Sequence, residues 1–325
     1  MMKTKEKLLQ LLDENKNNWV SGETSAQKLS ISRAAVWKAI KSLRNDGYLI
    51  DAVRNRGYRL VSDADILSEL GIWNYLQSEY SSLDIQVMSE VGSTNDSLRE
   101  KAIAGYPEGT VLIAGMQTDG KGRLGRRFYS PADTGVYMSI LLRPTDIQPS
   151  KALRLTTAAA VAVCRAIESV SGKDPKIKWV NDVYLDNRKV CGILTEGAVS
   201  LESGSLDYVV LGVGINVYRP EKGFPADIED IAGYIFEEKT SDGKNMIAAA
   251  FLNNFMKIYQ SGDFESYIDE YRKRSFVIKK NIDVINDGSI RKAFALGIDD
   301  NCRLIVCFED GTMEHLDAGE ISIRL

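Results

Sequence analysis

Clustered cations separated by glycines form the segment of this 325-residue chain that points most directly to chemistry. Residues 118–127 read Thr-Asp-Gly-Lys-Gly-Arg-Leu-Gly-Arg-Arg, so four cations fall within seven positions. They are Lys121, Arg123, Arg126 and Arg127. Backbone amides made accessible by glycine and neighbouring positive charges together suit phosphate or carboxylate groups. Two interpretations fit these residues: a loop that wraps a polyanion, and a flexible basic hairpin loop on the surface.

The glycines of this segment also satisfy the pattern G-x-G-x-x-G of dinucleotide-binding proteins. They are Gly120, Gly122 and Gly125. That motif must follow a strand and open a helix. Here the glycines lie in a long loop between two expected strands, 110–117 and 135–142. A dinucleotide-binding turn is therefore not expected.

A second polar group lies at a predicted hairpin further along the chain. Two apolar strands, 176–185 and 188–196, flank a polar turn. The returning strand would bring Lys189 close to Asn181 and Asp182. An Asn-Asp pair beside a lysine could orient substrate groups and a metal ion, and ordinary turn polarity explains the same residues.

The numbers and spacing of histidine and cysteine residues argue against most reactions and metal sites that depend on them. The only histidine is His315, and the four cysteines show no C-x-x-C spacing. A multi-histidine metal site, a Ser-His-Asp mechanism and a disulfide framework are therefore not expected, and no metal ligand is assigned. Any reaction must use Lys, Arg, Asp, Asn and backbone amides.

The first sixty residues are predicted to bind DNA. Three short helices are expected, the third over 33–45 behind a Ser32 cap, followed by strands 49–53 and 58–61. This order is typical of a winged helix-turn-helix, whose third helix enters the major groove. A small helical interaction domain with a solvated basic face is the alternative. The residues expected to contact DNA are Ser32, Arg33, Trp37, Lys38, Lys41, Arg54 and Arg56.

The charge distribution favours the DNA-binding interpretation. Residues 1–62 carry twelve Lys or Arg and six Asp or Glu, a balance of +6, although the whole chain has a net charge of −4. A basic head on an acidic body suggests that nucleic-acid binding is confined to the head. Residues 63–77 are expected to form a connecting helix. With no signal-like segment and no apolar run of about 18–20 residues, a cytoplasmic location is expected.

Taken together, these segments resemble the biotin protein ligase family, specifically its members that double as biotin operon repressors. The similarity runs along the whole chain, with the motifs in the family's order behind the winged helix. They are Ser93-Thr94-Asn95, Gln117, residues 120–126, Lys178-Trp179-Val180-Asn181-Asp182, Arg188-Lys189, residues 212–216 and residues 319–324.

The resemblance implies a role for each motif. The biotin ureido and carboxylate groups would be bound by Ser93, Thr94, Asn95 and Gln117. The loop that closes over biotin and the adenylate would contain Lys121, Gly122 and Arg123, and Lys189 would contact the biotin carboxylate. The adenylate or its magnesium shell would be contacted by Asn181, Asp182, Asn216 and Arg324. The residues expected to act in catalysis are Lys189, Arg123, Lys121 and Asp182.

Two positions depart from the family's usual pattern. Lys121 stands where the family usually has arginine, which keeps the charge but loses bidentate phosphate geometry. Val180 stands where the family has proline, which releases a fixed φ angle. Both are interpreted as tuning rather than loss of function.

The function implied by the resemblance joins catalysis and regulation. Biotin and ATP, with Mg²⁺, would form biotinyl-5′-AMP, and biotin would pass to a lysine of the biotin carboxyl carrier protein of acetyl-CoA carboxylase. Biotinyl-5′-AMP would also be the corepressor of a homodimer bound to operator DNA, with no membrane partner. A lipoate ligase and a purely regulatory, metabolite-sensing transcription factor are the alternatives.

The expected architecture is an α+β multidomain protein. A winged helix-turn-helix domain would span residues 1–62. An α/β catalytic domain with a mixed sheet would span 63–275, and a small SH3-like β barrel would span 276–325.

Overall fold

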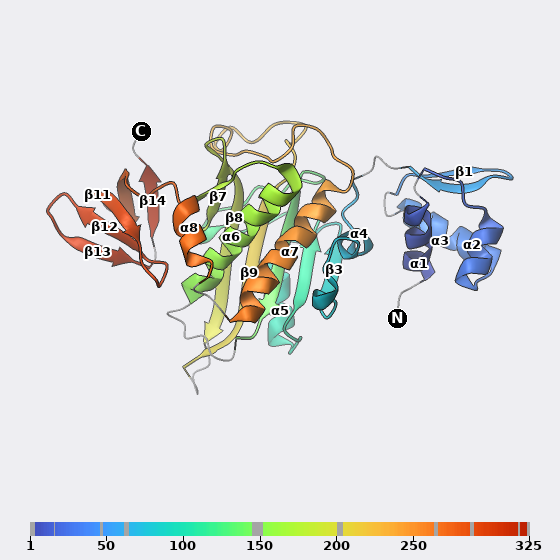
Figure 1. The fold of residues 1–325 in the computed structure, drawn as a ribbon, viewed down its shortest axis with the longest axis horizontal. Coiled ribbons are helices and arrows are strands. Elements are labelled where there is room, and N and C mark those ends of the chain that lie inside the picture. Colours follow the sequence, from blue (N-terminus) through green and yellow to red (C-terminus); the bar gives the residue numbers. More distant parts are fainter. Residues whose placement is uncertain are drawn as a thin grey trace. The chain divides into compact units, whose positions relative to one another are not determined.

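The computed structural model describes residues 4–15, 17–45, 48–61, 65–144, 152–199, 204–262, 266–286, 289–317 and 319–323. The chain divides into two compact units, Met1–Tyr75 with Lys239–Met246, and Leu76–Glu238 with Ile247–Leu325. Figure 1 shows the order of the elements along the chain. Within the described ranges, no helix is both long and apolar enough to cross a membrane.

The first unit begins with three helices and a two-stranded wing. These are α1 (Thr4–Glu14), α2 (Gly22–Leu29), α3 (Arg33–Asn45), β1 (Ile50–Val53) and β2 (Gly57–Leu60). The hydroxyl of Ser21 accepts a hydrogen bond from the Thr24 amide, and that of Ser32 accepts one from the Ala35 amide, so both helices have serine caps and the predicted Ser32 cap is present. The predicted winged helix-turn-helix is confirmed. Gly47, a glycine that could end the third helix shortly after residue 45, lies outside the described residues.

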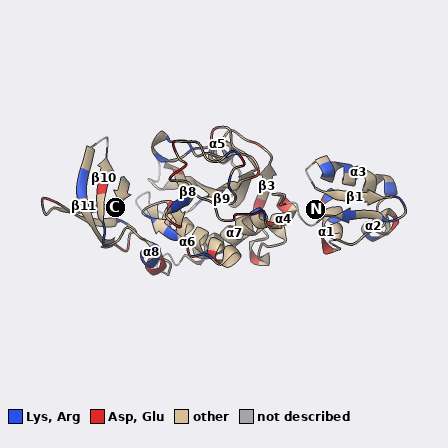
Figure 2. Ribbon diagram, turned by 90° about the horizontal axis from the view of Figure 1, so that it is seen from above, with Lys and Arg blue, Asp and Glu red and all other residues tan. Residues whose placement is uncertain are grey.

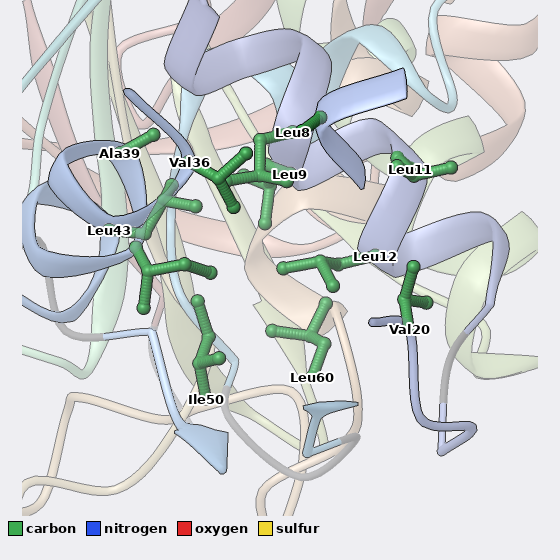
Figure 3. Packing of buried hydrophobic residues seen from close by; sticks show 12 residues of the cluster. Leu8, Leu9, Leu11, Leu12, Val20, Val36, Ala39, Leu43, Ile50 and Leu60 are labelled. Carbon is green, nitrogen blue, oxygen red and sulfur yellow. The ribbon is translucent and has the colours of Figure 1, made fainter. Parts of the chain in front are cut away.

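An apolar core fixes these helices against the wing. Leu8 and Leu12 of α1 and Val36 and Leu43 of α3 are fully buried, and Figure 3 shows them in one cluster with Leu60 of β2. Spacings of three and four residues put each set on one helix face, as the sequence pattern predicts. The side chains on the outer face of α3 are therefore not part of this apolar core.

Contacts of Arg44 and Gly57 help to fix the wing against the rest of this domain. Arg44 donates from its Nε and Nη2 to the carbonyl oxygen of Ile50, so this arginine closes the end of α3. Gly57 has a φ of 102°, and a Cβ there would lie 2.1 Å from the carbonyl oxygen of Val20. Only glycine permits this close approach.

The connecting helix expected over 63–77 is much shorter in the structure. The described helix is α4 (Glu69–Trp73), capped by the Ser68 hydroxyl, and residues 65–68 ahead of it are not helical. Asn245 explains part of this result, because its amide nitrogen donates to the Ile66 carbonyl and its oxygen accepts from the Ser68 amide. Tertiary hydrogen bonds replace the helical ones, so local propensity does not decide this segment.

The second unit is built on a seven-stranded mixed sheet. The strand order is β3-β4-β5-β9-β8-β7-β6, with β3 and β4 parallel and all other neighbours antiparallel. The strands are β3 (Asp84–Met88), β4 (Thr110–Ala114), β5 (Gly135–Leu142), β6 (Lys176–Lys178), β7 (Asp182–Leu185), β8 (Arg188–Val199) and β9 (Leu206–Asn216).

Helices cover both faces of this sheet. One face packs against α5 (Thr94–Ile103), whose Leu98 and Ala102 meet Leu112, Leu141 and Val210 of the strands. The helices α6 (Ala152–Ser171) and α7 (Gly243–Ser261) run side by side across the other face (Figure 1). The mixed sheet agrees with the sequence prediction, and the structure adds that helices cover both of its faces.

The C-terminal region, which follows α8 (Ile268–Arg274) in the chain, is a five-stranded antiparallel sheet. Its strand order is β13-β12-β11-β10-β14, so β13 and β14 stand at the two ends of the described pairings. The strands are β10 (Asn281–Asn286), β11 (Ser289–Ile298), β12 (Leu304–Phe308), β13 (Met313–Leu316) and β14 (Glu320–Ile323). The expected small β domain is therefore present as an antiparallel sheet.

Candidate functional site

A pocket lies over the middle of the large sheet, on the face covered by α5. Strands β5, β8 and β9 form its floor, the N-terminal end of α5 forms one wall, and the loop after β4 covers it. Its atom-free space is about 470 Å³, including the part open to solvent. Of the residues predicted from sequence, those that line it are Ser93, Thr94, Asn95, Gln117, Lys121, Gly122, Arg123, Asn181 and Lys189.

Two predicted site residues, Asp182 and Asn216, are not part of this lining. Asp182 forms an ion pair with Lys189, which does line the pocket. Asn216, at the end of β9, donates from its amide to the Gly233 carbonyl, 3.0 Å away. Arg324 lies outside the described residues.

A hydrogen-bonded polar network forms one end of the pocket. The Gln117 amide oxygen accepts from the backbone amide of Thr94 at 2.9 Å and from its hydroxyl at 3.1 Å. The Gln117 amide nitrogen donates to the Ser130 hydroxyl at 2.9 Å, which fixes the orientation of the side-chain amide. Such buried, oriented dipoles can recognise polar groups of a ligand at low entropic cost.

The Asn95 side chain, like that of Gln117, is oriented by hydrogen bonds at both its nitrogen and its oxygen. Its amide nitrogen donates to Glu196 at 2.7 Å, and its oxygen lies 2.7 Å from the Ser139 hydroxyl. Gly212 makes room for it, because a Cβ at Gly212 would lie 2.1 Å from the Asn95 amide oxygen. A glycine in the buried strand β9 thus allows a side chain of the site to approach the backbone closely.

Apolar side chains line another part of the pocket. The Phe128 ring lies against the glycines of the sheet, since a Cβ at Gly214 would lie 2.5 Å from it. Tyr137 packs edge-on against Phe128, with 6.3 Å between ring centroids. Burial raises the pKa of the Tyr137 hydroxyl, so this side chain is neutral. An elongated ligand with a polar head and an apolar body fits this lining.

The loop 118–127 covers the pocket, and two of its cations, Lys121 and Arg123, line it. Lys121 pairs with Asp96 of α5, with 2.6 Å between Nζ and Oδ2. Arg123 donates from Nη1 to the Asn181 amide oxygen at 3.1 Å. The backbone folds back on itself, because the Gly122 amide donates to the Arg126 carbonyl at 2.7 Å. The loop stands between two strands, which confirms that its glycines are not a dinucleotide-binding turn.

A third cation enters from the sheet. The Nζ of Lys189 lies 2.6 Å from Oδ1 of Asp182, and the side chains are 28% and 18% exposed. Oδ1 has no hydrogen bond of good geometry, so the ion pair is what compensates its burial. The predicted proximity of Lys189 to Asn181 and Asp182 is confirmed, and Lys121, Arg123 and Lys189 all line one pocket.

The strand expected over 176–185 is interrupted before Asp182. It forms β6 and β7 with a turn between them, and the Trp179–Val180 peptide bond in that turn is cis. The Trp179 indole nitrogen donates to the Cys302 carbonyl at 3.0 Å, and the Tyr271 hydroxyl donates to the Val180 carbonyl at 3.0 Å. The C-terminal sheet and α8 thus hold the turn that presents Asn181 to the pocket.

Replacing Trp179 with phenylalanine is expected to lower the free energy of unfolding by about 1–3 kcal/mol, because the buried Cys302 carbonyl loses its donor. Denaturant unfolding measures this change. Trp37→Phe is the matched control, since Trp37 is 57% exposed and the change should stay within about 0.5 kcal/mol. Equal losses of unfolding free energy in the two variants would contradict the idea that the hydrogen bond from Trp179 to Cys302 holds this turn in place.

The sequence motifs missed several residues of this site. Ser139 and Glu196 hold Asn95, Ser130 holds Gln117, and Asp96 holds Lys121. Asp96 directly follows a recognised motif, so adjacency was an available signal. Ser139 offered a weaker one, as a polar residue inside a buried strand.

The predicted DNA-contacting residues form a solvent-exposed surface on the first unit. All seven of them are exposed, on α3, at its cap, and in the turn of the wing. Figure 2 shows the basic residues on these elements. Trp37 is 57% exposed, with Lys41 Nζ 5.6 Å from its ring centroid. An exposed tryptophan flanked by cations suits a contact surface better than a solvated face.

Comparison with known proteins agrees with this geometry. The model of the "Biotin/lipoate A/B protein ligase family" matches residues 88–216, an "HTH domain" matches 4–59, and the "Biotin protein ligase C terminal domain" matches 280–324. The "Bifunctional ligase/repressor BirA" of Bacillus spizizenii is 34% identical over 91% of this chain and 85% of its own length. That of Escherichia coli is 27% identical over 94% and 92%.

A solved structure shares the fold of the larger part of the chain. The "Biotin protein ligase from Aquifex aeolicus in complex with biotin and ATP" has 26% identity and a TM-score of 0.61, and the match covers 74% of this chain and 98% of that one.

Fold, pocket and domain order define a biotin/lipoate-type protein ligase that carries a helix-turn-helix domain. The chain belongs to the family of bifunctional biotin protein ligases and biotin operon repressors.

Proposed function

We propose that this protein forms biotinyl-5′-AMP from biotin and ATP and transfers biotin to a lysine of a biotin carboxyl carrier protein. The observation that carries this proposal is the convergence of Lys121, Arg123 and Lys189 on a single pocket whose other end is a fixed polar network. A carboxylate and a triphosphate are both anionic, so three cations can hold them together. ATP enters as its magnesium complex, and the metal therefore arrives with the substrate.

The first reaction makes the unreactive carboxylate a mixed anhydride. A carboxylate oxygen attacks the α-phosphorus of ATP, a phosphorus–oxygen bond breaks, and pyrophosphate leaves. Lys189 lies at the attacking carboxylate, with Asp182 keeping its ammonium in place. Arg123 and Lys121 offset the charge that develops on the phosphate. Positioning and electrostatic stabilisation account for such a reaction without a protein nucleophile.

The second reaction transfers the acyl group. The deprotonated amine of the carrier lysine attacks the activated carbonyl carbon, and AMP leaves with the electron pair of the anhydride bond. Thr94, Asn95 and Gln117 hold the polar ring of biotin, and the loop 118–127 excludes water from the anhydride. Asn181 orients Arg123, and Asn216 and Arg324 remain proposed adenylate contacts.

The same adenylate is proposed to control repression. Two copies of the head, residues 1–62, are proposed to bind a two-fold operator as a homodimer, with biotinyl-5′-AMP as corepressor. The catalytic residues would lie in 63–275 and the small β domain in 276–325. Because ATP, the carrier protein and operator DNA are all needed, the cytoplasm is the proposed site of action.

One assay separates this proposal from its alternatives. The purified chain is incubated with ATP and either biotin with a biotin carrier domain or lipoate with a lipoyl domain. ATP-dependent labelling with biotin alone is expected. Labelling with lipoate alone would identify a lipoate ligase, and no labelling with either would leave only a metabolite-sensing regulator.

Replacing Gly212 with alanine tests the assigned role of Asn95. The new Cβ would lie 2.1 Å from the Asn95 oxygen, so we expect Asn95 to be displaced and biotin affinity to fall roughly tenfold or more. Isothermal titration with biotin measures the change. Gly297→Ala is the matched control, because no atom would lie within 4 Å of its Cβ. Unchanged biotin affinity in a folded Gly212 variant would remove Asn95 from the ligand site.

A further inference from the structure

The ion pair between Lys121 and Asp96 joins the loop 118–127 to α5. The Lys121 ammonium lies 2.7 Å from Oδ1 and 2.6 Å from Oδ2 of Asp96, so it sits between the two carboxylate oxygens. The side chains are 37% and 28% exposed, which places the pair partly out of solvent. Such a pair is screened less than one on the open surface.

Asp96 is itself held in place from two directions. It stands in the first turn of α5, where the helix dipole favours a negative charge. Arg99, one turn later, donates to Oδ1 at 2.6 Å. The same arginine lies 3.7 Å from Glu196, which accepts the hydrogen bond from Asn95. Charged contacts therefore run from the loop, through Asp96, to a proposed biotin-binding side chain.

The loop needs such an anchor because of its own charge. Its four cations repel one another, and its glycines give it a high conformational entropy when it is open. A second carboxylate, Asp119, lies 3.3 Å from Arg127, but these side chains are 63% and 76% exposed. An ion pair so exposed to water contributes little to the stability of the loop. Asp96 is thus the better placed of the two to hold the loop.

We propose that Asp96 is a positioning residue for the proposed ligase reaction: through Lys121 it holds the loop 118–127 over the pocket and so retains biotinyl-5′-AMP until the carrier arrives. Asp96 forms and breaks no bond of the reaction. Its carboxylate keeps the Lys121 ammonium at the mouth of the pocket, where it adds to the positive charge that faces the adenylate phosphate. The second half of this inference depends on the proposed function, whereas the first half concerns only the loop.

The loop half is tested on the full-length protein without ligand. Hydrogen exchange of residues 118–127 is compared in the wild type, Asp96→Asn and Asp119→Asn. We expect exchange about fivefold faster in Asp96→Asn, as the loss of one partly buried pair implies, and unchanged exchange in Asp119→Asn. Asp96→Glu should recover part of the protection, since it restores the charge. Equal exchange in all variants would overturn the proposal.

A double substitution separates the ion pair from general damage to α5. Lys121→Gln breaks the same pair from the loop side, so it should speed exchange by a similar factor. Combined with Asp96→Asn it should add little, because the second substitution has no pair left to break. Additive effects of the two substitutions would show that Asp96 acts on something other than Lys121, and would overturn the proposal.

The retention half is measured by release of biotinyl-5′-AMP. After one turnover with biotin and ATP, the adenylate is chased with excess unlabelled ligand. We expect release from Asp96→Asn several times faster than from the wild type and from Asp119→Asn, with the rate of adenylate formation changed much less. Tighter retention in Asp96→Asn would mean that Asp96 competes with the ligand for Lys121, which contradicts the proposal. A wild type that forms no adenylate would refute the ligase function, and the hydrogen-exchange comparison would still decide the anchor.

Discussion

Alanine in place of Lys189 is expected to slow biotin-dependent ATP–pyrophosphate exchange by at least about 100-fold, the effect of removing one preorganised charged donor from a developing charge. Two causes act in the same direction. The positive charge beside the attacking carboxylate is lost, and Asp182, now without its partner at 2.6 Å, presents an uncompensated negative charge to two anionic substrates. The loss should therefore appear in the rate of adenylation more than in biotin affinity.

Controls separate this role from an effect on the fold. Lys176→Ala removes a lysine from β6, two strands away from β8 in the same sheet, where it pairs with exposed Asp174 at 2.6 Å, and should leave exchange within about twofold of the wild type. Asp182→Asn combined with Lys189→Ala should recover part of the activity by removing the stranded charge. A folded Lys189→Ala protein with near wild-type exchange would show that this lysine does not act at the reacting centre.

Alanine at both Arg33 and Lys38 is expected to weaken operator binding roughly 10- to 100-fold while leaving adenylation unchanged. Both side chains are exposed on α3, which carries the proposed base contacts, and a lost contact of this kind costs about 1–3 kcal/mol. The pocket residues all belong to the other unit, so catalysis should not respond. Electrophoretic or fluorescence titration of an operator fragment, at one fixed salt concentration, measures the affinity.

The matched control is alanine at Lys7 and Lys28. These side chains are exposed on α1 and α2, so the net charge changes equally in both double variants. A smaller loss is expected, because these positions lie off the proposed recognition helix. Equal losses in the two variants would show that binding depends only on overall charge and that α3 does not read the DNA.

Local signals predicted the elements of this protein well. The bounds of α3 and of β5 agree with the sequence analysis to the residue, because caps, periodicity and flanking polar residues specify them locally. The turn at Asp186 and Asn187 was equally clear, and both residues have positive φ there, as a tight hairpin turn requires. The expected connecting helix was wrong in length, because Asn245 captures its backbone groups.

The sequence motifs also identified most of the residues that line the pocket. They did not identify the residues that hold those side chains in place. Asn95 and Ser139 are 44 positions apart, and Asn95 and Glu196 are 101 apart, so no periodicity could pair them. The interruption between β6 and β7 was hidden for the same reason, since the Cys302 carbonyl that binds the Trp179 indole lies 123 positions away. Contacts of this separation are decided by topology rather than by local pattern.

We propose that one adenylate serves both activities, as the intermediate of ligation and as the signal for repression. A single small head makes few base contacts, whereas two heads in a dimer gain effective concentration on a two-fold site. If the adenylate stabilises the dimer, it must tighten operator binding, and operator DNA must tighten adenylate binding by the same factor. Linkage of this kind is absent from an enzyme that is merely fused to a DNA-binding domain.

The most direct test is sedimentation and operator titration of the full-length protein with no ligand, with biotin alone, and with biotin plus ATP. We expect biotin plus ATP to give the largest dimer fraction and the highest operator affinity, and we expect Lys189→Ala to lose this response. Identical dimerisation and identical operator affinity in all three states would contradict ligand-controlled repression, whatever the ligase activity.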